Sequence, residues 1–203
     1  MKRYGIMGGT FNPIHLAHLY IAYEAKEQLD LDTIIFMPAG IPPHKRNNTI
    51  VDSSLRLEMV KLAIDDYEDF IVSDYEIEKQ GLSFTYETLS ALKKDDVELY
   101  FISGGDSLMD IESWKNTDCI LRDCNFVVFN RGEFSIEELE KQKKKLEDKY
   151  DANIILLNGV NIDISSSMIR DRLEEGKRVD FFLPDKVLKY IVDNGLYEGN
   201  KND

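Results

Sequence analysis

The most constraining feature of this sequence is a strand-to-helix junction close to its start. Residues 4–7 (YGIM) predict a short strand, two glycines follow, and the residues from 14 onward predict a helix. Gly8 and Gly9 lack a Cβ, so the backbone can turn tightly there and approach a ligand. Pro13 suits the start of a helix. The apolar face expected for this helix comprises Leu16, Leu19, Ala22 and Tyr23.

Two histidines make this junction a candidate phosphate site. His15 and His18 are three residues apart, so both should project from one side of the first helical turn. A helix N-terminus also presents backbone N–H groups and a positive dipole end, which favour anions. A histidine pair on a helix can equally be an ordinary surface or core feature. Glycines, proline and histidines combined at one junction favour the functional interpretation.

Length and composition predict one soluble domain. The chain has 203 residues, of which 43% are hydrophobic and 31% charged. We expect a single domain over 1–203, with a nucleotide-binding core to about residue 160 and a C-terminal helical part over 161–203. No apolar run is long enough for a membrane span and no signal peptide is evident, so a cytoplasmic location is expected. The oligomeric state stays open, a homo-oligomer included.

The formal net charge of −13 argues against nucleic acid as a partner, because binding its backbone requires a basic surface. A nucleotide needs only a local basic pocket, and a divalent cation would help to neutralise its phosphates. Cys119 and Cys124, with three histidines, do not match the spacing of zinc ligands. We therefore expect reduced structural cysteines and no zinc site, and the sequence identifies no metal-ligating residue.

Strands alternate with helices along the rest of the chain. Further strands are predicted at 33–37, 70–72, 99–103, 125–129 and 154–157, with 75–77 continuing the second of these or starting a sheet edge. Helices are predicted at 54–67, 107–114, 135–150, 165–176 and 184–194, and residues 83–92 are expected to be a loop that leads into a helix. This alternation predicts an α/β fold, with a Rossmann-like parallel sheet, helices on both faces and a small C-terminal helical subdomain.

Unusual polar clusters follow several predicted strands, where ligands of open parallel sheets collect. They are residues 42–45 (PPHK), 104–106 (GGD), 131–132 (RG) and 165–170 (SSSMIR). Each has a structural alternative, because Lys45 can be an exposed loop charge and Asp106 or the serines can cap helices. Likewise, Trp114 can be a core anchor and Thr85 can simply start a helix. The G-x-G-x-x-G and G-x-x-x-x-G-K-[ST] motifs are absent.

Residues 8–18 (GGTFNPIHLAH) resemble the signature of the nucleotidyltransferases that carry an H-x-G-H motif. Residues 42–45, 83–89 (SFTYETL), 105–106 followed by Trp114, and 164–170 (ISSSMIR) resemble, more narrowly, the bacterial nicotinate-nucleotide adenylyltransferases. That resemblance implies transfer of the adenylyl group of ATP to nicotinate mononucleotide with Mg²⁺, giving nicotinate adenine dinucleotide and pyrophosphate.

The resemblance also implies a role for each matching residue. Catalytic roles fall to His15, His18, Lys45 and Arg170. ATP binding falls to Gly8, Gly9, Thr10, Phe11, His15, His18, Ser166, Ser167 and Arg170. Binding of the mononucleotide falls to His44, Lys45, Thr85, Asp106 and Trp114, with Thr85 and Trp114 around the nicotinate ring.

Three positions depart from the family pattern. Asn12 stands where Asp is common, Ala17 stands in the usual glycine position, and Ser167 replaces Thr. Asn12 puts any role of that carboxylate in doubt, and the methyl of Ala17 reduces close ligand approach. Two alternatives stay open: a sister adenylyl- or cytidylyltransferase with another phosphorylated acceptor, and a non-catalytic nucleotide-binding module.

Overall fold

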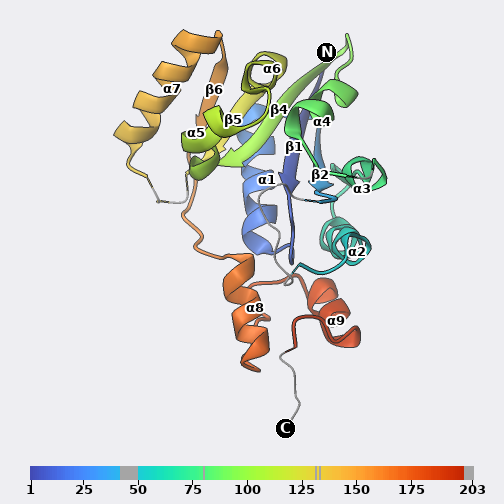
Figure 1. The fold of residues 1–203 in the computed structure, drawn as a ribbon. Coiled ribbons are helices and arrows are strands. Elements are labelled where there is room, and N and C mark those ends of the chain that lie inside the picture. The colour runs from blue at the N-terminus through green and yellow to red at the C-terminus, as the bar shows by residue number, and fades with distance from the viewer. Residues whose placement is uncertain (42–49, 80, 131, 133, 199–203) are drawn as a thin grey trace.

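The computed structural model describes residues 1–41, 50–79, 81–130, 132 and 134–198. Its sheet is entirely parallel, with the strand order β3-β2-β1-β4-β5-β6 (Figure 1). The strands are β1 (Lys2–Gly9), β2 (Thr33–Pro38), β3 (Phe70–Val72), β4 (Val97–Gly104), β5 (Asn125–Phe129) and β6 (Asn153–Leu157). The predicted α/β class with a parallel sheet is confirmed.

Successive side chains of each strand enter opposite cores, since strand side chains alternate between the faces of a sheet. Ile6 and Ile35 belong to one core, whereas their neighbours Met7 and Phe36 belong to the other. Helices with residues in the Met7 core are α1 (Leu16–Leu29), α2 (Ser53–Ile64), α8 (Ser166–Glu174) and α9 (Asp185–Asp193). Those with residues in the Ile6 core are α4 (Thr85–Leu92), α5 (Gly105–Asp110), α6 (Thr117–Asp123) and α7 (Ile136–Tyr150).

Local signals in the sequence set several of the helix ends. Ser135 and Glu138 form a capping box at the start of α7: the Ser135 N–H donates to the Glu138 carboxylate at 2.8 Å, and the Glu138 N–H donates to Ser135 Oγ at 3.2 Å. Ser165 Oγ accepts from the Met168 N–H at 3.2 Å and so caps α8, as its structural alternative predicted. Gly195 follows α9 with a φ of +58°, which suits glycine.

Three local expectations were wrong. Residues 75–77 are not strand but lie in the short helix α3 (Tyr75–Glu78), which starts where Ser73 Oγ accepts from the Tyr75 N–H. The helix expected over 107–114 ends at Asp110 and continues as a 3₁₀ turn over Ile111–Ser113. The sequence also missed α6, which begins after Asn116 at a φ of +56°, a conformation that interrupts the apolar periodicity.

The buried face of α1 also differs from the expected one. Leu16 is 38% exposed and Tyr23 is 52% exposed, whereas Leu19 and Ala22 are buried as expected. The other buried positions are Ala17, Ile21 and Ala25. Small alanine side chains let this helix lie close against the sheet, and the larger Leu16 and Tyr23 are turned outward.

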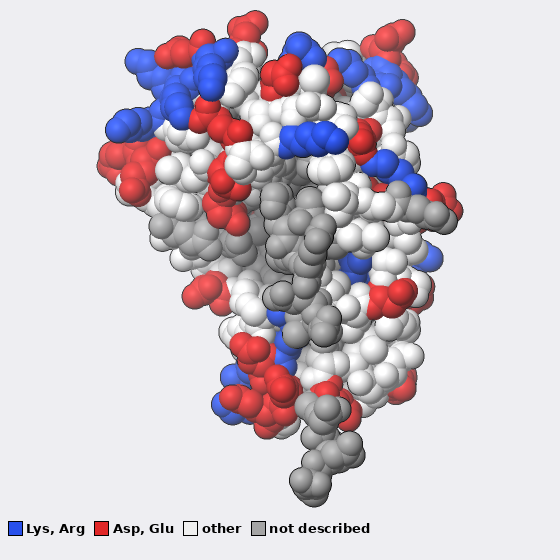
Figure 2. All heavy atoms as spheres, in the orientation of Figure 1, with Lys and Arg blue, Asp and Glu red and all other residues white. Residues whose placement is uncertain are grey.

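In the orientation of Figure 1, acidic and basic side chains are interspersed over the visible face of the molecule, and many described residues near its middle are uncharged (Figure 2). The group of basic side chains at the upper left lies over α7, most of whose lysines are exposed, as is usual for a charged surface helix. Within the described residues, no helix combines the length and apolar character that a membrane crossing requires.

Candidate active site

The candidate site lies where the strand order reverses. β1 is flanked by β2 on one side and β4 on the other, so chain connections run in opposite directions from this point. Open parallel sheets bind ligands beyond the carboxyl ends of such strands. β1 ends at Gly9 and β4 ends at Gly104, and two hollows open beside these ends.

The turn after β1 brings its backbone close to aromatic side chains. A Cβ on Gly9 would lie 3.0 Å from the ring of Phe11, so glycine is favoured there. Phe11 is buried with a φ of +48°, and a cis peptide bond joins Asn12 to Pro13. The Phe11 ring meets the His18 ring edge-on, with centroids 5.1 Å apart. Phe11 thus supports the second histidine from behind.

His15 and His18 lie together, as the sequence predicted. Their rings stack with centroids 3.7 Å apart and an interplanar angle of 23°. His15 is the N-cap residue of α1, and its backbone N–H donates to His18 Nδ1 at 3.2 Å. A nitrogen that accepts a hydrogen bond has no proton of its own, so this geometry assigns the proton of neutral His18 to Nε2.

The helix N-terminus itself is less available to an anion than expected. The Leu16 N–H at its first position donates to the Phe182 carbonyl at 3.0 Å, and the His15 N–H is committed to His18. Two backbone donors therefore already have acceptors within the protein. The His18 ring lines one of the two hollows. It is therefore the donor of this turn that is placed to contact a ligand bound there.

A buried arginine that the sequence did not reveal joins the ends of the first two strands. The Arg56 side chain donates to the carbonyls of Thr10 at 2.8 Å, Gly40 at 3.0 Å and Val51 at 3.1 Å. It is only 1% exposed, and burial lowers the pKa of its guanidinium. Arg56 lies on α2 and has no motif around it, so only the structure identifies its role.

Asn12 is the centre of a second polar cluster. Its Oδ1 accepts from the Tyr197 hydroxyl at 2.8 Å and from the Val51 N–H at 3.2 Å, while its carbonyl accepts from Arg170 Nη1 at 2.8 Å. The neighbouring Pro13 carbonyl accepts from the Ser166 hydroxyl at 2.8 Å. The side chain and backbone of Asn12, with the Pro13 carbonyl, therefore tie the turn to the segment just before α2, to α8 and to the C-terminal segment.

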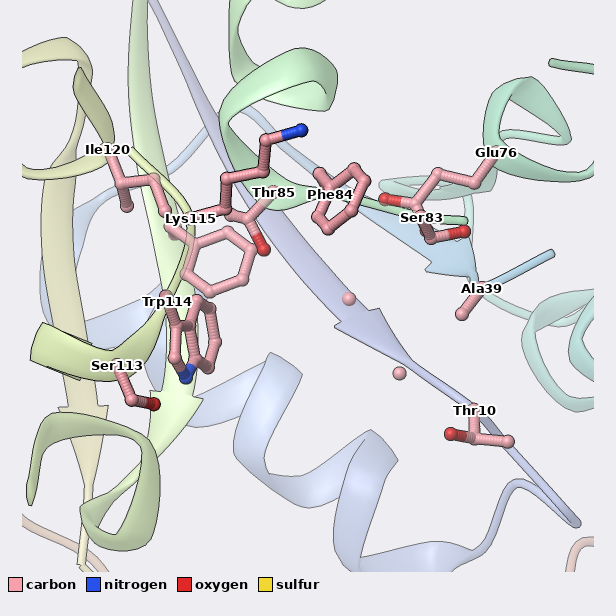
Figure 3. A pocket seen from close by; sticks show the side chains of 13 residues that line it. Thr10, Ala39, Glu76, Ser83, Phe84, Thr85, Ser113, Trp114, Lys115 and Ile120 are labelled. Carbon is pink, nitrogen blue, oxygen red and sulfur yellow. The ribbon is translucent and has the colours of Figure 1, made fainter. Parts of the chain in front are cut away.

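The larger hollow has a volume of about 300 Å³ and aromatic walls (Figure 3). Trp114 is half-buried and meets Phe101 edge-on, with centroids 6.2 Å apart. The residues that line this hollow are Gly8, Gly9, Thr10, Ala39, Glu76, Ser83, Phe84, Thr85, Phe101, Ser113, Trp114, Lys115 and Ile120. The helix-start interpretation of Thr85 is also correct, since this residue is the first of α4.

Glu76 is the carboxylate in this lining. It is buried, and its Oε1 accepts from the Thr88 hydroxyl at 2.6 Å. Burial raises the pKa of the Glu76 carboxyl above its ordinary value, because the charged form loses its hydration. The nearby Ser83 Oγ accepts from the Gly40 N–H at 3.0 Å, which joins this wall to the end of β2.

The smaller hollow adjoins the larger one, because Gly8, Phe101 and Trp114 line both. It also contains His18 and Asp106, with Asp106 in the first turn of α5. Gly104 rather than Asp106 is the N-cap residue, so the capping alternative for Asp106 was wrong. The shared wall brings the histidine turn and the aromatic hollow into one continuous site.

The predicted site residues fall into distinct groups. Lining the hollows are Gly8, Gly9, Thr10, His18, Thr85, Asp106 and Trp114. Phe11 and His15 lie buried behind the turn, Ser166 and Arg170 hold its backbone, and Ser167 is exposed beside them. His44 and Lys45 lie outside the described residues. Sequence reasoning missed Arg56, Lys115 and Tyr197, which belong to no charge or spacing motif, and it assigned no role to Phe84, which lies within residues 83–89.

The chain is similar to known proteins over almost its whole length. A family model described as cytidylyltransferase-like matches residues 6–172. A protein of Clostridium botulinum (strain Eklund 17B / Type B), named "Probable nicotinate-nucleotide adenylyltransferase", is 58% identical over 198 residues, which cover 98% of this chain and 99% of the relative. A protein of the same name from Clostridium perfringens (strain 13 / Type A) is 51% identical over 199 residues, covering 97% and 98%.

The fold is also that of a solved adenylyltransferase. The structure titled "Plasmodium falciparum nicotinic acid mononucleotide adenylyltransferase complexed with NaAD" matches with a TM-score of 0.81 and 22% identity, covering all of both chains. At this identity the likeness concerns the fold. The family model and the sequence relatives give the assignment: the chain belongs to the cytidylyltransferase-like family and, within it, to the nicotinate-nucleotide adenylyltransferases.

Proposed function

We propose that this protein transfers the adenylyl group of ATP to nicotinate mononucleotide, giving nicotinate adenine dinucleotide and pyrophosphate. The observation that carries the proposal is the continuous site at the β1–β4 switch point. There His18 and Asp106 line one hollow, and Trp114 forms part of the wall shared with the aromatic one. The full-length relatives bear the name of this activity.

In the proposed reaction a phosphate oxygen of the mononucleotide attacks the α-phosphorus of ATP. The bond from that phosphorus to the oxygen bridging to the β-phosphate breaks, and pyrophosphate leaves with the electron pair. Such a transfer needs positioning and stabilisation of negative charge rather than a protein nucleophile. The Nε2–H of His18 is the donor we assign to the phosphates, with His15 fixing the orientation of its ring.

The remaining residues have supporting roles in this proposal. The backbone of Gly8, Gly9 and Thr10 lies along the junction of the two nucleotides, and Phe11 supports His18. Because the Ser166 hydroxyl and one Arg170 nitrogen already donate to the turn, part of their role is to hold it in place. Triphosphate binding by Ser166, Ser167 and Arg170, phosphate binding by Lys45 with His44, and binding of nucleotide hydroxyls by Asp106 stay predictions.

Mg²⁺ is compatible with the residues of this site. Within the described residues, no group of three or more His, Cys, Asp or Glu side chains is arranged to hold a metal ion. Mg²⁺ characteristically keeps waters and binds through one or two carboxylates together with substrate phosphates. Asp106 is the carboxylate in the hollow that His18 lines. When bound with the nucleotide, Mg²⁺ would supply charge neutralisation, with Asp106 as its protein ligand in place of the hydroxyl-binding role that the family resemblance implies.

Pyrophosphate release with a panel of acceptors tests the proposal. The purified protein, ATP and Mg²⁺ are incubated with nicotinate mononucleotide, nicotinamide mononucleotide or 4′-phosphopantetheine. We expect the highest kcat/KM with nicotinate mononucleotide. Turnover of 4′-phosphopantetheine alone would instead assign the chain to a sister transferase, and binding of ATP without turnover of any acceptor would leave a non-catalytic nucleotide-binding module.

A further inference from the structure

Lys115 is the basic residue that lines the aromatic hollow within the described part of the chain. It follows Trp114 directly, and its side chain reaches over the ring of Phe84 (Figure 3). Its Nζ lies 4.3 Å from the centroid of the Phe84 ring and 5.6 Å from that of Tyr86. Two aromatic faces therefore hold this ammonium group at the edge of the hollow through cation–π contacts.

The charge of Lys115 is not neutralised by the described carboxylates. No ion pair links its Nζ to any described Asp or Glu side chain. The contrast is Lys79, which forms an ion pair with Glu87 on α4. Glu87 also accepts a hydrogen bond from the Tyr86 hydroxyl at 2.8 Å. Lys115 thus presents an unpaired positive charge beside an apolar slot.

Glu76 makes the two sides of the hollow electrostatically different. Glu76 lines the same hollow and lies across the Phe84 ring from Lys115 in the view of Figure 3. An aromatic ring that carries a carboxylate would be repelled at the Glu76 side and attracted at the Lys115 side. A ring that carries a neutral amide would experience neither effect to the same extent. Such a lining would discriminate between a charged and an uncharged substituent on the same ring.

We propose that Lys115 recognises the ring carboxylate of the acceptor and so sets the preference for nicotinate over nicotinamide mononucleotide. The inference rests on the proposed function, because it assigns a specificity-determining residue within the same site. A charge-assisted hydrogen bond or close ion pair to a partly dehydrated carboxylate corresponds to roughly tenfold or more in affinity. Its loss should raise KM for the acid and leave KM for the amide little changed.

The test compares Lys115→Gln and Lys115→Arg with the unaltered enzyme, using ATP and each mononucleotide in turn. We expect Lys115→Gln to lower kcat/KM for the acid by about tenfold, mainly through KM, with little change for the amide. Lys115→Arg should keep most of the acid preference, since it keeps the charge. Lys144→Gln, an exposed lysine of α7, is the matched control for the change in net charge.

The acid-to-amide ratio of kcat/KM decides the outcome. A ratio in Lys115→Gln equal to that of the unaltered enzyme overturns the proposal, as does an equal fall of the ratio in Lys144→Gln. Raised ionic strength should lower the acid preference of the unaltered enzyme more than that of Lys115→Gln, and the reverse result contradicts the assignment. If the unaltered enzyme does not use nicotinate mononucleotide at all, the proposed function fails independently of Lys115.

Discussion

The two ends of the site are built by different kinds of interaction. At the histidine turn, buried polar groups hold backbone carbonyls: Arg56 binds those of Thr10, Gly40 and Val51, and Arg170 binds that of Asn12. At the aromatic hollow, ring contacts dominate, with Trp114 edge-on to Phe101 and a lysine over Phe84. One end is fixed by hydrogen bonds and the other by apolar surface.

This difference suits the ligands that each end is proposed to hold. A phosphate requires donors at fixed positions, and donors hold their positions when their supporting groups are fully hydrogen-bonded. A flat ring requires complementary area, which half-buried aromatic side chains supply with fewer constraints on geometry. Substitutions at the histidine turn should therefore damage both stability and catalysis, whereas those at the aromatic hollow should mainly change acceptor preference.

The largest expected effect is that of Arg56→Met on stability. The substitution leaves three part-buried carbonyls, those of Thr10, Gly40 and Val51, without their shared donor. We expect the free energy of unfolding to fall by about 3–5 kcal/mol, because acceptors shielded from water that lose a charged donor are costly. Urea denaturation followed by circular dichroism measures the change.

Lys61→Met is the matched control for this substitution. It removes a basic residue of the same helix whose side chain is 51% exposed and, within the described part of the chain, pairs only with Glu58, at 3.7 Å. Its cost should lie within about 1 kcal/mol, as for other exposed ion pairs. Equal losses of unfolding free energy in the two variants would mean that the polar network does not fix the turn. The proposed difference between the two ends of the site would then be wrong.

The next largest effect is that of His18→Ala on turnover. Removing the donor that faces the smaller hollow should lower kcat on the order of a hundredfold or more, since donors to the transferring phosphate act mainly in the transition state. The fold should survive, because His18 is only half-buried. Steady-state pyrophosphate release, with circular dichroism as a check on folding, measures both. Unchanged turnover would remove His18 from the reaction.

Sequence reasoning recovered the parts of the molecule that local patterns encode. The parallel sheet, its two apolar faces and the histidine pair follow from periodicity and from a short motif after β1. The supporting contacts are not local: Tyr197 reaches Asn12 across 185 residues, and Arg56 reaches Thr10 across 46. A single sequence carries no signal for such pairs, and for this reason Arg56 and Tyr197 were missed.

Lys115 was missed for a different reason. It stands next to Trp114, which the sequence singled out, yet one lysine in a chain with many charged residues is ordinarily a solvated surface group. Its significance comes from the absence of a carboxylate partner within the described residues and from the two rings beneath it. Both facts depend on tertiary structure.

Tyr197→Phe should have a smaller effect at the histidine turn. The substitution removes one of the two donors to Asn12 Oδ1 found among the described residues and leaves the Val51 N–H in place. We expect the free energy of unfolding to fall by about 1 kcal/mol, the net value typical of one hydrogen bond. Tyr23→Phe, at a residue that is 52% exposed on α1, serves as the control and should change stability by only a few tenths of that. An equal change of unfolding free energy in both variants would show that the Tyr197 hydroxyl does not stabilise the protein through Asn12.

The smallest effect concerns the pH dependence that Glu76 imposes on the aromatic hollow. Burial raises the pKa of this carboxyl in the folded protein, so the folded state binds its proton more tightly than the unfolded chain does. Its contribution to stability is therefore fully present below the ordinary Glu pKa of about 4.3 and is lost as the pH rises through the raised value. Glu76→Gln cannot lose a proton, so its stability relative to the unaltered protein should improve across that window and then level off.

Denaturation by urea at several pH values measures the trend. Glu78→Gln, at an exposed position of the same short helix, is the control and should show no comparable trend. A difference between Glu76→Gln and the unaltered protein that does not vary with pH would show that burial of this carboxyl does not influence the hollow.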